Sequence, residues 1–367
     1  GQIKPPVMGA AAFVLAEFVG LPYAQVALHA AIPAVLYYVA LFMAIHFEAR
    51  RTGLRGLRPD ETPPLRGVLL ARGHMLIPIV GLVWLMWEGY TAFLAAFWSI
   101  VLVAAVGALR RGTRLDAAGF FEALKNGGQN TVGVAAACAC AGVVIGVIAH
   151  TGLAIKFTSF VLSIAEGSLI PALVLTMIAG IILGMGMPTT AAYVMQAALL
   201  VPALIKLGVL PIAAHMFVFY FAILSAITPP VALAVYAASG ISGTPLWATG
   251  MAAVRLGATG FIVPFFFVYG PALLLIGSWG EVALAVGTSC LGVTFLAAGL
   301  HGFLLAPLRM WERLTLGAGS LLLIHSGWQT DLIGLALAGA VVLSQRLAPL
   351  PQPPVPDAQA AVAPTRL

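Results

Sequence analysis

Charged side chains are so scarce in this chain that they limit the folds open to it. Only 18 Lys and Arg and 12 Asp and Glu occur among 367 residues, whereas 61% of the residues are hydrophobic. A soluble domain carries about 25% charged residues, because its surface must face water. So few charges cannot cover a globular protein of this length. The composition therefore predicts an all-α polytopic membrane protein, whose outer surface contacts the lipid bilayer.

Basic residues give the chain a formal net charge of +6, and they gather in short loops between apolar runs. No basic stripe interleaved with aromatic residues occurs, so the pattern indicates positive-inside topology rather than nucleic-acid binding. We predict that the Arg-rich loops are cytoplasmic and that the Trp-containing turns lie at the outer interface. The loops are 47–66, 109–126 and 306–313, and the turns are 88–90, 278–281 and 327–331.

Apolar runs between these connections are the candidate membrane spans. A helix needs about 20 residues to cross the hydrocarbon core. Runs that are much shorter or longer than this indicate hairpins or broken helices rather than single spans. The runs occupy approximately 7–19, 25–46, 67–87, 90–108, 129–152, 167–205, 211–239, 248–277, 282–305, 314–326 and 332–345.

The run 167–205 predicts a re-entrant hairpin. Its centre reads Gly184-Met185-Gly186-Met187-Pro188-Thr189-Thr190, and the flanking arms, 169–183 and 191–205, have 15 residues each. An arm of this length reaches about 22 Å, which is short of the far side of the membrane. Two ordinary spans joined by a tight turn are the alternative, but a Gly/Thr/Pro tip suits an unwound backbone that is buried in protein.

The run 211–239 predicts a broken helix. Thr228-Pro229-Pro230 interrupts it near its middle. Each Pro lacks a backbone donor, and the residue before a Pro is pushed out of helical geometry. The carbonyl groups around 225–228 therefore lose their helical partners. A simple proline kink is the alternative, but a double Pro after a hydroxyl residue favours a break that forms a binding site.

A short internal repeat relates the start of the chain to this break. Ile3-Lys4-Pro5-Pro6-Val7 matches Ile227-Thr228-Pro229-Pro230-Val231, and after a one-residue slip Gly20-Leu21-Pro22 matches Gly243-Thr244-Pro245. A long apolar span follows each copy, and the charge pattern orients these two spans in opposite directions. Two copies of opposite orientation form an inverted-topology repeat, which is the architecture of many secondary transporters.

These segments together resemble one protein family. The first ten residues, the hairpin centre through Tyr193 and the segment from Ile227 to Gly240 are similar to the large, M-type membrane subunit of TRAP (tripartite ATP-independent periplasmic) transporters. The chain most resembles the fused permeases of the TAXI subgroup, over about 1–277. Its last two spans resemble the extra C-terminal segment of those permeases.

The resemblance implies an elevator-type, sodium-coupled importer in the bacterial inner membrane. Its substrates would be organic acids such as C4-dicarboxylates, keto acids or glutamate-like molecules, delivered by a periplasmic substrate-binding protein. A small Q-type membrane subunit, or its fused equivalent, would be a second partner. Because the sequence opens abruptly at Gly1, we expect a C-terminal fragment, with the Q-type equivalent and the first hairpin in the missing N-terminal part.

The resemblance also implies where ions and substrate bind. The hairpin tip would face the break of the second repeat, and Gly1 to Pro6 would form the corresponding break of the first. Unwound carbonyls and hydroxyls supply the oxygen ligands that sodium requires, and helix N-termini attract anionic substrates. We expect no cofactor and no other metal, with sodium bound through Gly184, Gly186, Thr189, Ala226 and Thr228. The whole ion and substrate site would comprise Gly184, Gly186, Pro188, Thr189, Thr190, Ser225, Ala226, Ile227, Thr228, Pro229, Pro230, Gly1, Gln2, Lys4, Pro5 and Pro6.

Lys4 departs from the family pattern, in which this position of the break is usually neutral. A lysine at membrane depth is costly and usually functional. It could contact a substrate carboxylate or replace a cation. The alternatives are a side chain that snorkels into an aqueous cavity and a position near a fragment edge that is not native.

Other classes of function have less support in the sequence. The motifs G-x-x-x-x-G-K-[ST], G-x-S-x-G and H-E-x-x-H do not occur, which disfavours an ATP-driven transporter and an intramembrane enzyme. Acidic residues lie near span ends without an acidic partner, and the histidines are scattered, so sodium coupling is favoured over proton coupling. A channel is the other alternative, and the inverted repeat disfavours it.

These features divide the chain into five predicted parts. They are the end of the first inverted repeat at 1–46, cytoplasmic loops with two connecting spans at 47–126, the second inverted repeat at 127–277, additional spans at 278–346 and a disordered tail at 347–367.

Cysteine labelling tests the predicted orientation. Single cysteines are introduced at Arg55 and at Gln329 in a version that lacks the native Cys138, Cys140 and Cys290. Because the Trp turns face outside in this topology, an impermeant maleimide applied from outside should label Gln329→Cys but not Arg55→Cys. The reverse labelling pattern would contradict the orientation.

Overall fold

The computed structural model describes residues 1–6, 8–54, 56, 62, 64–110, 113–114, 116–165, 168–325 and 327–347. The predicted tail beyond 347 lies outside these residues, as do Val7 of the repeat and most of the loop 55–63.

Helices make up all the regular elements of the described residues, apart from one isolated β-bridge between Phe303 and Pro307. Seven helices in this part of the chain are long and apolar enough to cross a membrane. The prediction of an all-α polytopic membrane protein is therefore confirmed.

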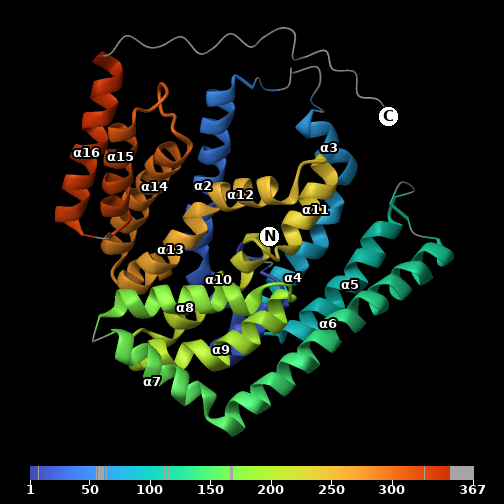
Figure 1. Cartoon of the computed structure of the whole chain (residues 1–367). Coiled ribbons are helices and arrows are strands. Elements are labelled where there is room, and N and C mark those ends of the chain that lie inside the picture. Colours follow the sequence, from blue (N-terminus) through green and yellow to red (C-terminus); the bar gives the residue numbers. More distant parts are fainter. Residues whose placement is uncertain are drawn as a thin grey trace. The chain divides into compact units, whose positions relative to one another are not determined.

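Two compact units divide the described chain, which Figure 1 colours along the sequence. Unit 1 comprises the described residues of 1–31 and 59–254, and unit 2 those of 32–58 and 255–367. The chain passes between the units inside two helices. These are α2 (Tyr23–Thr52), which changes unit after Ala31, and α12 (Leu246–Leu256), which changes unit after Val254.

Unit 1 is built around α8, α9 and α10, which pack against one another, while α1 packs on α9 and α10. Every residue of α10 from Ile212 to Ala222 is buried. A helix that is apolar all round belongs in the centre of a bundle. The helices of unit 1 are α1 (Ala10–Val19), α3 (Leu65–Arg72), η1 (Gly73–Leu76), α4 (Ile77–Trp87), α5 (Ala92–Ala108), α6 (Ala117–Thr151), α7 (Leu153–Ala165), α8 (Leu169–Gly184), α9 (Thr189–Lys206), α10 (Pro211–Leu224), η2 (Ser225–Ile227) and α11 (Leu233–Ser242), together with most of α12 and the start of α2.

The two copies of the internal repeat have the same local structure. Pro5-Pro6 and Pro229-Pro230 both contain a cis peptide bond. Each is followed by a ten-residue helix, α1 in the first copy and α11 in the second. Both helices end at a glycine in the left-handed conformation, Gly20 and Gly243, which side chains rarely adopt. The sequence match thus corresponds to a match in backbone structure, while the opposite orientation of the copies stays a prediction.

Two helices of unit 1 differ from the predicted spans. Helix α6 begins 12 residues before the predicted run at 129, inside the loop expected at 109–126, because the side chain of Asp116 caps it by accepting a hydrogen bond of 2.8 Å from the Gly119 amide. Helix α7 was not predicted, since Lys156 interrupts its apolar residues. It nevertheless buries Thr158, Val161 and Ala165, and it packs against α8 and α9.

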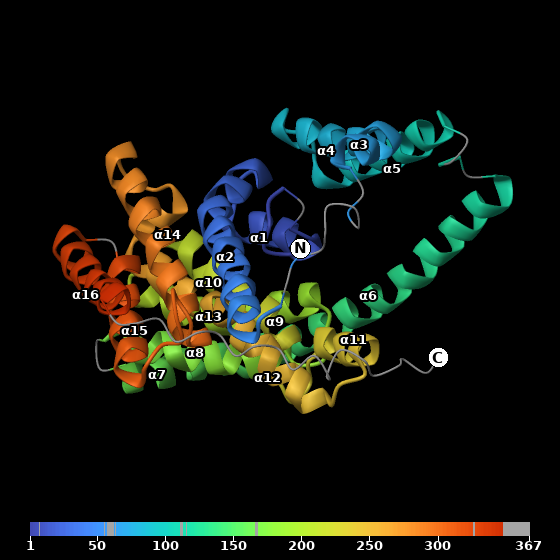
Figure 2. The ribbon, with the colours of Figure 1, turned by 90° about the horizontal axis from the view of Figure 1, so that it is seen from above.

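Unit 2 is a bundle in which α14, α15 and α16 lie side by side, as Figure 2 also shows. Ala44 and Phe47 of α2 join the bundle's core with Ala297, Leu316 and Val341. The predicted turn at 327–331 largely forms the first turn of α16. The helices are α13 (Ala258–Tyr269), η3 (Pro271–Leu274), α14 (Trp279–His301), α15 (Met310–Ile324) and α16 (Trp328–Leu347), together with the C-terminal part of α2.

Close glycine contacts hold α15 against α16, and they lead to a test of this packing. A Cβ atom on Gly334 would lie 2.8 Å from the carbonyl oxygen of Gly319 and 2.7 Å from Cγ of Leu323. Gly334→Ala should therefore lower the free energy of unfolding by about 1–3 kcal/mol, as overpacked contacts do. Thermal unfolding in detergent micelles measures the effect. Gly339→Ala is the matched control, because nothing lies within 4 Å of a Cβ there. Equal stability of the two variants would contradict the packing.

Candidate ion and substrate site

The centre of the predicted hairpin forms a short tip between two helices of unit 1. Helix α8 ends at Gly184, α9 begins at Thr189, and Pro188 is the residue that precedes α9. Gly186 in the tip has a φ of +74°, a conformation that favours glycine. The amide of Met187 donates to the Gly184 carbonyl over 3.3 Å.

The predicted helix break is present between α10 and α11. After α10 the chain forms one 3-10 turn, and Thr228 is then extended, as expected for a residue before proline. Within the described residues, no backbone amide donates to the carbonyl of Ala226 or Ile227. These two carbonyl oxygens are the uncommitted acceptors that the double proline predicts.

The hairpin tip packs directly on this break. A Cβ atom on Gly184 would lie only 2.5 Å from Oγ of Ser225, and one on Gly186 would lie 3.2 Å from Cγ1 of Val231. Ser225 is 1% exposed, and its hydroxyl donates to the Ala222 carbonyl over 2.8 Å. The close packing of the hairpin on the break therefore depends on Gly184 and Ser225.

The break of the first repeat also reaches the hairpin tip. The Thr189 hydroxyl donates to Oε1 of Gln2 over 2.7 Å, although 187 positions separate them in the chain. Tyr23 secures the same segment from the start of α2, because its hydroxyl donates to the Pro6 carbonyl over 2.6 Å. Three segments that the sequence places far apart, namely both breaks and the hairpin tip, thus meet within unit 1.

Exposure separates the predicted site residues into three groups. The half-buried group holds the threonines and the uncommitted carbonyls, so it is best placed to present oxygens to a small ligand. Buried residues are Gly184 and Ser225; exposed residues are Gly1, Gln2, Lys4, Gly186 and Pro230; half-buried residues are Pro5, Pro6, Pro188, Thr189, Thr190, Ala226, Ile227, Thr228 and Pro229.

The hydroxyl protons of two site threonines point to protein acceptors. Thr228 donates to the Leu224 carbonyl over 2.8 Å, and Thr189 donates to Gln2 as described above. A hydroxyl has two further lone pairs on its oxygen, which remain able to accept a hydrogen bond or ligate a cation. Lys4 is exposed, and its ammonium forms no ion pair with the described residues.

Sequence reasoning missed one polar residue of the hairpin. Gln196 in α9 is fully buried, and its Nε2 donates to the carbonyl of Gly180 in α8 over 2.8 Å. Its Oε1 has no hydrogen-bond partner among the described residues. Gln196 is the one amide side chain in 167–205, which is the signal that could have identified it. It ties the two arms of the hairpin together just below the tip.

The fit of Gly184 on Ser225 can be tested with a pair of substitutions. Gly184→Ala should lower the free energy of unfolding by about 1–3 kcal/mol through overpacking. Ser225→Gly removes the two Ser225 atoms that lie within 3 Å of the new Cβ, so the double variant should regain part of that loss. Thermal unfolding in micelles measures all three, with Gly240→Ala in α11 as the control in open space. Additive losses in the double variant would show that the two residues do not touch.

A known protein family matches the part of the chain that contains the hairpin and both breaks. The family model described as "Tripartite ATP-independent periplasmic transporter, DctM component" matches residues 1–282. No curated protein and no solved structure matches the chain. The matched residues include both breaks, the hairpin and the start of α14, whereas α15 and α16 lie beyond them.

Membership of this family defines the general role of the chain. The DctM component is the permease of a secondary transporter, and it acts with a periplasmic binding protein and a small membrane subunit. The family is one of transporters and not of enzymes. With more than half of its residues matched and with helices that can span a membrane, the chain belongs to the DctM family of TRAP transporter permeases.

Proposed function

We propose that this permease imports an organic acid across the bacterial inner membrane together with sodium, and that it takes the substrate from its periplasmic binding protein. The observation that carries the proposal is the hydrogen bond from Thr189 to Gln2. It joins the hairpin tip to the first break, while Gly184 packs the same tip on the second break. The tip and both breaks, at which several short helices begin or end, are thereby brought together.

Sodium binding is supported by the neutral oxygens around the tip. Helix α8 ends at Gly184 and the 3-10 turn after α10 ends at Ile227, so both direct carbonyl groups toward the breaks. The negative ends of half-helices and unwound carbonyls are typical ligands for coupling ions in transporters. Oxygens of Thr189 and Thr228 add to this set, because their protons are already donated to protein acceptors.

An anionic substrate is supported by the opposite ends of the helices. Helices α9, α11 and α1 all begin next to the tip or the breaks, at Thr189, Leu233 and Ala10. Helix N-termini carry partial positive charge and attract carboxylates. Lys4 adds a full positive charge without an ion-pair partner in the described residues. C4-dicarboxylates, keto acids and glutamate-like molecules share this carboxylate chemistry, and the binding protein would select among them.

An elevator-type movement is supported by the division into units. All the site residues lie in unit 1, so movement of this unit as a body would carry the whole site across the membrane. The TAXI assignment and the Q-type partner, or its fused equivalent, belong to the same proposal. The two helices of unit 2 beyond the family match agree with the extra C-terminal segment expected for the TAXI subgroup.

A sodium titration tests the coupling ion. Thr189→Val and Thr228→Val remove one oxygen ligand each with little change in shape, so they should raise the sodium concentration for half-maximal uptake by about tenfold, the effect of losing roughly 1.4 kcal/mol of binding free energy. Uptake is measured in proteoliposomes with the full transporter and its binding protein. Thr131→Val is the matched control, because this hydroxyl also donates to a carbonyl one turn earlier but lies in α6.

The same assay includes a proton gradient without sodium. Equal uptake under that condition would contradict sodium coupling, whatever the threonine variants do.

Replacement of Lys4 tests its role in substrate binding. If its ammonium attracts the substrate carboxylate, Lys4→Met should raise the substrate concentration for half-maximal uptake and leave the sodium dependence unchanged. An unchanged apparent affinity for the substrate would instead mean that the Lys4 side chain only extends into an aqueous cavity.

A further inference from the structure

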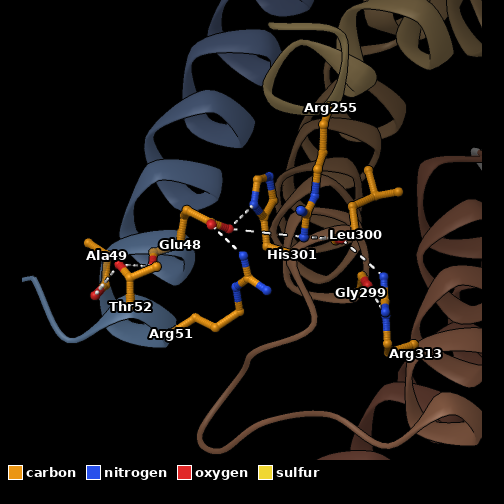
Figure 3. Close-up of polar contacts among 9 residues, drawn as sticks. All are labelled: Glu48, Ala49, Arg51, Thr52, Arg255, Gly299, Leu300, His301 and Arg313. Atoms are coloured by element: carbon orange, nitrogen blue, oxygen red, sulfur yellow. Dashed lines mark hydrogen bonds and ion pairs between the residues drawn. The ribbon is translucent and has the colours of Figure 1, made fainter. Parts of the chain in front are cut away.

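Glu48 is the centre of the largest charged network in the described residues, and sequence reasoning did not single it out. Figure 3 shows its carboxylate among three basic side chains. Oε2 lies 2.9 Å from Nδ1 of His301 and 4.0 Å from Nη2 of Arg255. Oε1 lies 2.5 Å from Nη2 of Arg51. All four residues belong to unit 2.

Most residues of this network lie on the helices that connect the two units. Glu48 lies in the last two turns of α2, and Arg255 lies at the end of α12. These are the two helices inside which the chain passes between the units. His301 is the last residue of α14 and is 2% exposed. One carboxylate therefore joins the unit 2 ends of both connecting helices to α14.

Further contacts make the attachment firm. Arg255 donates to the Leu300 carbonyl over 3.1 Å, and Arg313 of α15 donates to the carbonyls of Gly299 and Leu300 over 2.9 and 3.2 Å. Guanidinium groups at a helix C-terminus are favourably placed against its dipole. Phe47 of α2 packs in the adjoining apolar core, to which Leu256 of α12 also contributes.

From this arrangement we propose that Glu48 is a positioning residue, which holds the ends of α2 and α12 against α14. Unit 2 would then stay fixed and serve as the pivot when unit 1 moves. The inference rests on the proposed elevator-type transport. If these contacts were weakened, the connecting helices would shift against α14 whenever unit 1 moves. Fewer movements of unit 1 would then complete a transport cycle. Substrate and sodium would still bind as before, because their site lies in unit 1.

The proposal predicts a separation of rate from affinity. Glu48→Gln should lower the maximal rate of uptake per folded transporter several-fold. It should leave the half-saturating concentrations of substrate and sodium within experimental error of the unmodified protein. Uptake is measured in proteoliposomes of the full transporter with its binding protein, and the amount of folded protein is normalised by size-exclusion chromatography.

Glu312→Gln is the matched control for lost stability. Glu312 is a second acid of unit 2; it is buried (3% exposed), whereas Glu48 is half-buried, and it accepts hydrogen bonds from the Arg309 amide and the Ser344 hydroxyl. These two hydrogen bonds link α15 to α16, and neither of them involves a connecting helix. Both variants should unfold at lower temperature, but only Glu48→Gln should lose rate. An equal loss of rate in the two variants would overturn the proposal.

A double variant tests whether Glu48 acts through His301. If the two side chains work as one link, Glu48→Gln with His301→Gln should be no slower than the worse single variant. Multiplied losses would overturn the link. Should Glu48→Gln fail to fold, Arg255→Gln removes only the polar contacts of α12 with Glu48 and Leu300 and provides the same comparison with Glu312→Gln. Uptake that needs no sodium, yet still slows in Glu48→Gln, would contradict the proposed coupling ion and leave the pivot standing.

Discussion

An apolar chain in a bilayer must satisfy its backbone hydrogen bonds internally, and the rest of this structure depends on that constraint. Within the hydrocarbon region no water replaces a lost partner, so unwound backbone is tolerated only where protein covers it or where it lines a cavity. The double proline at Pro229-Pro230 breaks the rule locally by leaving the Ala226 and Ile227 carbonyls without amide donors. The hairpin tip packs against Ser225 at the start of this break, and it can do so because Gly184 lacks a side chain. The close contact between Gly184 and Ser225 thus places the hairpin tip next to the segment that carries these uncommitted oxygens.

The first repeat has a break of the same kind. Its break carries the same double proline, and the following helix ends at the same kind of glycine. Gln2 contributes a side-chain acceptor there, and Thr189 of the tip uses it. The Thr189–Gln2 hydrogen bond therefore links the hairpin tip to the first break, as the Gly184–Ser225 contact links it to the second.

The sequence allowed prediction of the features that depend on local chemistry. Pro229-Pro230 and the Gly/Pro tip identify the break and the hairpin, because adjacent prolines and closely spaced Gly and Pro disfavour a continuous helix. The limits of α6 and the existence of α7 could not be inferred from apolar runs, since Asp116 extends one helix and Lys156 conceals the other. Long-range pairs were also inaccessible: nothing near Gln2 indicates a partner 187 positions away, and nothing near Glu48 indicates His301. The burial of Gln196 against Gly180 likewise depends on how the two hairpin arms meet.

Sodium-dependent protection at the hairpin tip tests the central claim most directly, since that claim is an ion held where the tip meets the breaks. Thr190 is half-buried beside Thr189. Thr190→Cys in a version without native cysteines therefore reports how accessible the hairpin tip is to the label. The measurement is the rate of maleimide labelling in sodium and in choline at equal ionic strength. The account predicts slower labelling in sodium, with loss of that protection when Thr228→Val is added. Identical labelling rates in sodium and choline would contradict it.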